Sequence, residues 1–178
     1  MKTLYKYFLS IFIFITTMLL AGCPQGGRRM LIGDTSSKAD AMIDQIIEFV
    51  NNRDSDGLKE LFSKQVLNDI EDIDIQIEQL FCFIQGEIKY REENTGIGES
   101  SSVDYGKRKK SYIAPYVINT NEEVYYFYII ERLINTENPD DVGLYMIRAI
   151  KADDRYTPPN GEYWENRAGI YIPIPSDK

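Results

Sequence analysis

The chain has 178 residues, 43% of them hydrophobic and 12% aromatic, so disorder over the whole length is excluded and one domain plus a targeting segment is the expected size. The formal net charge of −8 at pH 7 argues against nucleic acid as a partner, because phosphate binding needs a positive field. Histidine is absent, which excludes His-based triads, His metal ligands and imidazole pH switches.

Residues 1–22 have the pattern of a signal peptide. Lys2 and Lys6 precede an apolar run from Phe8 to Leu20. A helix over that run spans about 20 Å, which is too short for a hydrocarbon core of about 30 Å. A basic start followed by a short apolar run is typical of an exported protein.

The end of this segment resembles a bacterial lipobox, formed by Leu20, Ala21, Gly22 and Cys23. The resemblance implies cleavage before Cys23 and acylation of its thiol by fatty acids such as palmitate. We therefore expect a lipid-anchored protein on the extracytoplasmic face of the cell membrane. The alternative is an ordinary signal peptide, or an uncleaved anchor, with an incidental cysteine.

Residues 23–37 contain three glycines and little periodicity, which predicts a lipidated N-terminus on a flexible tether. The folded domain is then expected over residues 38–174. Cys82 lies in the apolar segment QLFCFIQG, so we expect a buried thiol. Because Cys23 would be lipidated, no disulfide is expected.

Helical periodicity occupies the first half of the domain. A first helix is expected to start at Ser36 or Ser37 and to end at Asn51 and Asn52. A short second helix is expected to start at Asp54. A third is predicted over residues 67–84 and stops at Gly86. The apolar stripes of the three helices are Ala39, Met42, Ile43, Ile46, Ile47 and Val50, then Leu58, Leu61 and Phe62, then Ile70, Ile73, Ile77, Leu80, Phe81 and Ile84.

Strand-like segments follow. Segments rich in Tyr, Ile, Val and Phe and bounded by turn residues predict strands at 111–119, 124–134 and 142–151, with shorter strands at 87–92 and 169–174. The polar segment 93–106 is expected to be a loop. Helices followed by strands indicate an α+β fold, with three N-terminal helices on one face of an antiparallel sheet.

This order of elements resembles the curved, cone-shaped folds related to nuclear transport factor 2 (NTF2-like folds). Four segments resemble uncharacterised lipoproteins of Firmicutes that share a domain of unknown function, DUF5104. These segments are LKELFSK at 58–64, LFCFIQG at 80–86, ENPDDVGLYMIRAI at 137–150 and GIYI at 169–172. The resemblance covers residues 38–172 and the lipobox. It implies a location and a fold, and it implies no activity.

Charged residues within the apolar strands indicate a ligand pocket. If Ile134 lies opposite Val142, then Arg148 lies opposite Tyr128. The face of Arg148 would then include Tyr126, Tyr128, Ile130, Arg132, Leu144, Met146 and Ile150, and the other face Tyr125, Phe127, Ile129, Glu131, Tyr145 and Ile147. We expect Tyr126, Tyr128, Arg132 and Arg148 to form a pocket for an anionic or amphipathic ligand. The alternative is a satisfied salt bridge or an arginine on a solvated face.

Other polar segments have structural explanations. The basic run 107–110 could contact anionic lipid or a cell-wall polymer, but lysines that discourage edge pairing are the favoured interpretation. The acidic run 68–74 lacks the order of a calcium loop and suits a solvated helix face. No metal or cofactor is expected.

The C-terminal part of the chain contains an aromatic tail, which consists of Tyr156, Tyr163, Trp164 and Tyr171. This tail could form a partner surface or, as we favour, a lid over the sheet.

The sequence thus predicts a lipid-anchored surface protein that binds an envelope protein or a small ligand without catalysis. One alternative is an enzyme that uses Asp or Glu with Tyr as acid and base, because enzymes on NTF2-like folds use these residue types. A second alternative is a structural envelope protein. No motif in the sequence has catalytic spacing.

Overall fold

The computed structural model describes residues 27–92, 96–154 and 166–172. The leader, the lipobox residues Leu20, Ala21, Gly22 and Cys23, and the aromatic residues Tyr156, Tyr163 and Trp164 lie outside the described residues. The chain divides into two units, Met1–Asp34 and Thr35–Lys178. The second unit contains the whole described core and is the folded domain considered below.

The helices are α2 (Gly27–Asn52), α3 (Ser55–Glu60), α4 (Lys64–Asp69) and α5 (Ile73–Phe83). The prediction of a single helix over residues 67–84 is wrong, because this segment is divided between α4 and α5. Ile70 adopts an extended conformation that ends α4, and Ser63 caps the N-terminus of α4 by accepting a hydrogen bond from the Val66 amide. The described part of the domain therefore has four α-helices, where three helices were predicted.

The start of the first helix also differs from the prediction. We expected a cap at Ser36 or Ser37, but α2 already begins at Gly27, so residues 27–37 of the expected tether are helical. Arg28, Met30 and Leu31 are good helix formers, and a single interior glycine such as Gly33 costs only about 1 kcal/mol. The short second helix begins as predicted, because Asp54 accepts a hydrogen bond from the Gly57 amide at 2.9 Å.

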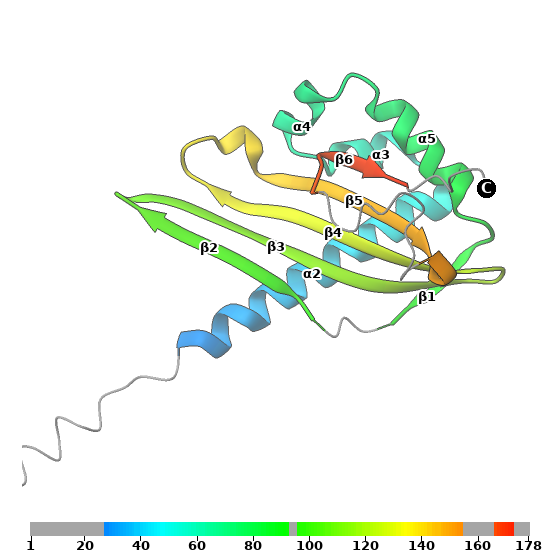
Figure 1. The fold of residues 1–178 in the computed structure, drawn as a ribbon, viewed down its shortest axis with the longest axis horizontal. Helices are drawn as coiled ribbons and strands as arrows, with labels where there is room; N and C mark the ends of the chain where they lie inside the picture. Colours follow the sequence, from blue (N-terminus) through cyan, green and yellow to red (C-terminus); the bar gives the residue numbers. More distant parts are fainter. Residues whose placement is uncertain (1–26, 93–95, 155–165, 173–178) are drawn as a thin grey trace, which may run out of the picture. The chain divides into compact units, whose positions relative to one another are not determined.

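The sheet contains β1 (Ile88–Arg91), β2 (Gly98–Asp104), β3 (Lys107–Thr120), β4 (Val124–Asn135), β5 (Gly143–Lys151) and β6 (Gly169–Tyr171). Its order is β1-β3-β4-β5-β6, and β2 also pairs with β3 (Figure 1). Strands β5 and β6 are parallel while the other pairs are antiparallel, so the sheet is mixed and the all-antiparallel prediction is wrong. Short 3₁₀ helices, η1 (Pro139–Asp141) and η2 (Ala152–Asp154), flank β5.

Strand β2 was expected to be part of a loop. All of its residues are exposed, and its sequence GESSSVD has no apolar alternation that could indicate a strand. It forms by pairing along seven residues with β3. Pro115 lies on β3 between the segments that pair with β1 and β2, a position where a missing amide proton is tolerated.

The helices cover one face of the sheet, which we call the helix face. Alternate residues of β3 and β4 on this face are buried against α2 and α5, as the apolar stripes predicted. The main contributors are Ile43, Ile46, Ile77 and Leu80 from the helices and Tyr112, Ala114, Tyr116, Ile118, Tyr125, Phe127 and Ile129 from the strands. Each buried Ile or Leu contributes about 1.5–3 kcal/mol of transfer free energy.

Cys82 does not join this core. The buried side chains of α5 are Ile73, Ile77, Leu80 and Phe81, and Cys82 points away from their stripe and is exposed. The predicted buried thiol is therefore wrong, because the helical period outweighs the apolar neighbours along the sequence. No helix within the described residues has the length and apolarity needed to cross a bilayer.

Candidate functional site

Polar side chains meet near one end of the opposite face of the sheet. We call this face the open face, although Tyr128, Met146 and Arg148 on it are buried. The pairing of β2 with β3 places Ser100 beside Ser111, and the pairing of β3 with β4 places Ser111 beside Arg132. Paired residues point to the same side of a sheet, so two hydroxyls and a guanidinium form a row across three strands. A second row places Ser102 beside Lys109.

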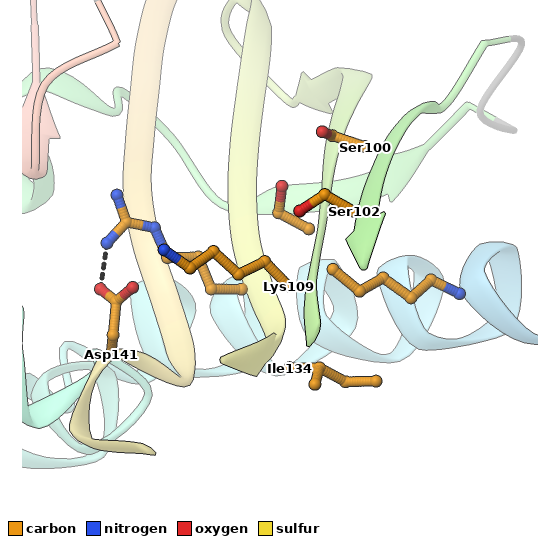
Figure 2. Close-up of a pocket in the computed structure, with 8 residues that line it drawn as sticks. Ser100, Ser102, Lys109, Ile134 and Asp141 are labelled. Atoms are coloured by element: carbon orange, nitrogen blue, oxygen red, sulfur yellow. Dashed lines mark hydrogen bonds and ion pairs between the residues drawn. The ribbon is translucent and has the colours of Figure 1, made fainter. Parts of the chain in front are cut away.

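These rows form the floor of a hollow of about 330 Å³. Figure 2 shows Ser100 and Ser102 on one side of it and Asp141, from η1, on the other. The lining consists of Ser100, Ser102, Lys109, Lys110, Ser111, Arg132, Ile134 and Asp141. Its volume is at the lower end of the range for small-molecule sites, and its lining is mostly polar.

Arg132 is held in place from two directions. Its guanidinium lies 3.7 Å from the centroid of the Tyr145 ring, and it forms an ion pair with the buried carboxylate of Asp141, shown by the dashed line in Figure 2. Asp141 also accepts a hydrogen bond from Asn135 Nδ2 at 2.8 Å. A guanidinium has five N–H donors and one carboxylate takes at most two, so donors remain for a ligand.

Lys109 is a second cation of the site. Its Nζ lies 2.7 Å from one oxygen of Glu137, whose other oxygen lies 2.7 Å from Lys107 Nζ. The hydrogen bond from Lys107, followed in size of effect by that from Lys109, lowers the pKa of Glu137 to about 2. This carboxylate is therefore ionised at neutral pH. Because the Lys109 side chain is 54% exposed, its ion pair is weak and can be exchanged for an anionic ligand.

Lys110 has a different role despite lining the hollow. Its ammonium group lies 3.4 Å from Glu99 and donates to the Thr35 hydroxyl at 3.0 Å. Thr35 in turn donates to Glu99 at 2.7 Å. The Lys110 charge is therefore used to attach α2 to β2 and β3, and we assign it no contact with a ligand.

The four residues predicted to form a ligand pocket lie in two separate parts of the sheet. The expected pairing of Arg148 with Tyr128 is present, and Tyr126 lies on the same face of β4. The Arg148 guanidinium lies 6.0 Å from the centroid of the Tyr128 ring and 5.6 Å from that of Tyr171. Arg148 is only 4% exposed. Arg132 is four residues further along β4 than Tyr128, about 13 Å away at 3.3 Å per residue, and lines the hollow.

The predicted face assignment fails at two residues because β5 has a bulge. Ile130 pairs with Met146 but Glu131 pairs with Leu144, so Tyr145 is an extra residue between them. Leu144 is consequently buried in the core on the helix face, and Tyr145 lies beneath Arg132. The sequence predicted the opposite placement for both.

A tyrosine and a carboxylate, the pair that the enzyme alternative requires, meet on the helix face. Tyr112 donates a hydrogen bond to Glu131 at 2.5 Å. Burial raises the pKa of both groups; the hydrogen bond raises that of Tyr112 further and partly offsets the increase for Glu131, as Lys38 does. Tyr112 is 1% exposed and Glu131 is half-buried, so the tyrosine hydroxyl has no open access for a substrate.

Several site residues were not identified from the sequence. Ser100, Ser102 and Ser111 carry no motif, and only the pairing of β2 with β3 brings them together. Asp141 was not singled out as a site residue from the sequence, but it is buried and pairs with Arg132. Among the described residues, no group of three or more acidic or cysteine side chains has an arrangement that could hold a metal ion.

Comparison with known proteins identifies the family. The model of a domain of unknown function (DUF5104) matches residues 45–152, which include α3, α4, α5 and η1, strands β1 to β5 and all of the residues that line the hollow. The chain therefore belongs to the DUF5104 family. A search of curated proteins found no match.

Proposed function

We propose that this protein is a Firmicutes lipoprotein, held on the extracytoplasmic face of the cell membrane by acyl chains on Cys23, and that its domain binds a small hydrophilic anion without catalysis. An NTF2-like fold is part of the same proposal. The lipobox residues and the family match support the proposed lipid anchor. The α+β domain, whose helices cover one face of a sheet, supports the proposed fold.

The observation that supports anion binding best is the row of Ser100, Ser111 and Arg132 on the floor of the hollow. Arginine with adjacent hydroxyl groups binds carboxylates and phosphates through charge-assisted hydrogen bonds. The Arg132 guanidinium is already fixed by Tyr145 and Asp141, so little side-chain entropy is lost on binding.

The remaining lining indicates the rest of the ligand. Ser102 can accept hydrogen bonds from ligand hydroxyls, while Ile134 is the one aliphatic side chain of the lining. A site with so little apolar surface suits a hydroxylated anion, such as an acidic or phosphorylated sugar, better than a lipid. A ligand of this kind also suits a hollow of about 330 Å³.

Catalysis is left out of the proposal for a specific reason. The Tyr112 and Glu131 pair lies on the helix face, and Tyr112 is closed to solvent. The hollow itself contains one carboxylate, Asp141, which is occupied by Arg132 and Asn135. Binding is therefore better supported than acid–base chemistry.

Calorimetric titration of the Thr35–Lys178 domain tests the proposal. The probes are glucuronate, glycerol 3-phosphate and inorganic phosphate, with glucose as the uncharged control. We expect at least one anion to bind, glucose not to bind, and Arg132→Gln to weaken anion binding by about tenfold or more, since a hydrogen bond to a charged group contributes about 1.5–3 kcal/mol.

Two further variants separate loss of binding from loss of folding. Lys109→Gln changes an exposed side chain and is expected to weaken anion binding by about fivefold without unfolding the domain. Arg108→Gln is the matched control, because Arg108 is the neighbouring residue on β3 and does not line the hollow. The proposal is wrong if none of the anions binds, or if Arg132→Gln and Lys109→Gln bind as tightly as Arg108→Gln.

A further inference from the structure

The turn between β2 and β3 has an unusual residue in a strained conformation. Tyr105 has a φ of 44° and Gly106 a φ of 81°. Positive values at both central residues are typical of a type I′ hairpin turn, where Asn or Asp followed by Gly is preferred. A tyrosine is strained there because its Cβ approaches the backbone.

Packing does not compensate for this strain. Tyr105 is 99% exposed, the most exposed of the large hydrophobic side chains in the described part of the chain. Val103, two residues earlier, is 71% exposed. Figure 1 shows this turn at the left end of the sheet, away from α3, α4 and α5. Residues in sparsely populated backbone conformations cluster at functional sites, and burial does not explain the conformation of Tyr105.

The charges near the turn differ between the two sides of the hairpin. Lys107 and Lys109 point to the side of the open face, where both pair with Glu137 and Asp104 lies opposite Lys107. Arg108 points to the other side, directly opposite Val103. Within the described residues, the Arg108 side chain has no carboxylate as an ion-pair partner. The hairpin tip, defined as Val103, Tyr105 and Arg108, thus combines an aliphatic, an aromatic and a cationic side chain.

We propose that the hairpin tip contacts the surface of an anionic lipid bilayer. Tyr105 would lie at the level of the headgroups, where amphipathic aromatic rings are favoured. Val103 would enter the boundary with the acyl chains, and Arg108 would bind lipid phosphate. Three side chains at a hairpin turn offer much less area than the roughly 1,000 Å² that a specific protein interface needs, which favours a membrane over a protein partner.

This contact is separate from the anion site and can be tested separately. The Thr35–Lys178 domain is mixed with vesicles of phosphatidylcholine alone or with added phosphatidylglycerol, and the bound fraction is measured by flotation at millimolar lipid. We expect binding to the anionic vesicles that decreases with added salt. Arg108→Gln should reduce the partition coefficient by about fivefold, which corresponds to about 1 kcal/mol for one cation at an anionic surface.

The apolar contribution is tested by replacing Val103 and Tyr105 together with serine, which should reduce the partition coefficient by about tenfold or more. Tyr90→Ser is the matched control, since Tyr90 is an exposed tyrosine on β1 and should have no effect. All three replacements are at exposed positions, so folding is expected to be retained. The proposal is overturned if the domain does not bind anionic vesicles, or if the tip variants bind as well as Tyr90→Ser. Arg132→Gln should leave vesicle binding unchanged, which distinguishes this site from the hollow.

Discussion

Arg132 and Tyr145 stack on each other, although regular alternation along β4 and β5 would put them on opposite faces of the sheet. The guanidinium lies 3.7 Å from the ring centroid. The stacking depends on the bulge in β5, where Tyr145 is the extra residue between Leu144 and Met146. The bulge thereby redirects an aromatic ring beneath the guanidinium that we assign to anion binding.

The first prediction concerns this stacking. Tyr145→Ala should weaken anion binding by about two- to fivefold, because a cation–π contact at a partly exposed site contributes about 0.5–1 kcal/mol to fixing the guanidinium. Tyr145→Phe retains the ring and should bind as the unmodified protein does. Calorimetric titration with the best anion from the panel measures both. Equal weakening by the two variants would show that the ring is not the relevant part of Tyr145.

The second prediction concerns pH and the buried pair on the helix face. Burial raises the pKa of Glu131, so the folded state holds its proton more tightly than the unfolded state does. The free energy of unfolding should therefore fall as pH rises above about 4.3, the ordinary pKa of glutamate, towards the raised value in the folded state. Glu131→Gln removes this ionisation and retains an acceptor for the Tyr112 hydroxyl.

Urea unfolding of the two proteins between pH 4 and pH 8 measures the effect. The stability of Glu131→Gln relative to the unmodified protein should increase with pH across this window. A constant difference would contradict the prediction, since it would mean that Glu131 titrates alike in the folded and unfolded states.

The third prediction concerns Gly143, at the start of β5. Its φ is 134°, and a Cβ at this position would lie 3.0 Å from the Ser63 amide nitrogen. This close approach allows Ser63 to donate to the Leu144 carbonyl at 3.0 Å, and Leu144 to donate to the Leu61 carbonyl at 2.9 Å. Gly143→Ala should lower the free energy of unfolding by about 2–3 kcal/mol in urea titration.

Gly96 provides the matched control for that substitution. A Cβ at Gly96 would have no heavy atom within 4 Å, and its φ lies outside the left-handed region. Gly96→Ala should therefore change the free energy of unfolding by no more than about 0.5 kcal/mol. Comparable destabilisation by both variants would show that the approach of Ser63 to β5 is not what requires glycine at 143.

The fourth prediction concerns the proposed anchor. Cys23→Ala should abolish incorporation of radiolabelled palmitate in the native cells, because the proposed acylated thiol is removed. Cys82→Ala should leave labelling unchanged, since Cys82 is the other cysteine of the chain. Palmitate labelling that persists in Cys23→Ala, or is absent from the unmodified protein, would contradict lipidation at Cys23.

The apolar pattern predicted most of the domain core. The stripe of α2 was located from side-chain period, and the strands now named β3, β4 and β5 were located from their content of Tyr, Ile, Val and Phe and their bounding turn residues. The pairing of Arg148 with Tyr128, which the structure contains, was derived by assuming that Ile134 lies opposite Val142. Such patterns arise because each buried face must be apolar. Apolar patterns do not predict a strand that forms by backbone pairing with its neighbour and buries no side chains. Strand β2, whose residues are all exposed, is such a strand.

The hollow could not be predicted for the same reason. Ser100 and Ser102 are on β2, the strand that the pattern missed, and their position near Arg132 depends on the pairing of three strands. The bulge at Tyr145 has no signature in the sequence, and one extra residue exchanges the faces of Leu144 and Tyr145. Arg132 was identified because an arginine in an apolar strand is conspicuous, and its neighbours were identified only from the structure.

The most direct test of anion binding in the hollow is an NMR titration of the ¹⁵N-labelled Thr35–Lys178 domain with glucuronate, glycerol 3-phosphate and inorganic phosphate. We predict saturable shifts of the backbone amides of Ser100, Ser111 and Arg132, and no comparable shifts when glucose is added. Saturable shifts centred elsewhere, for example around Arg148, or no saturable shifts with any of the anions, would contradict the account.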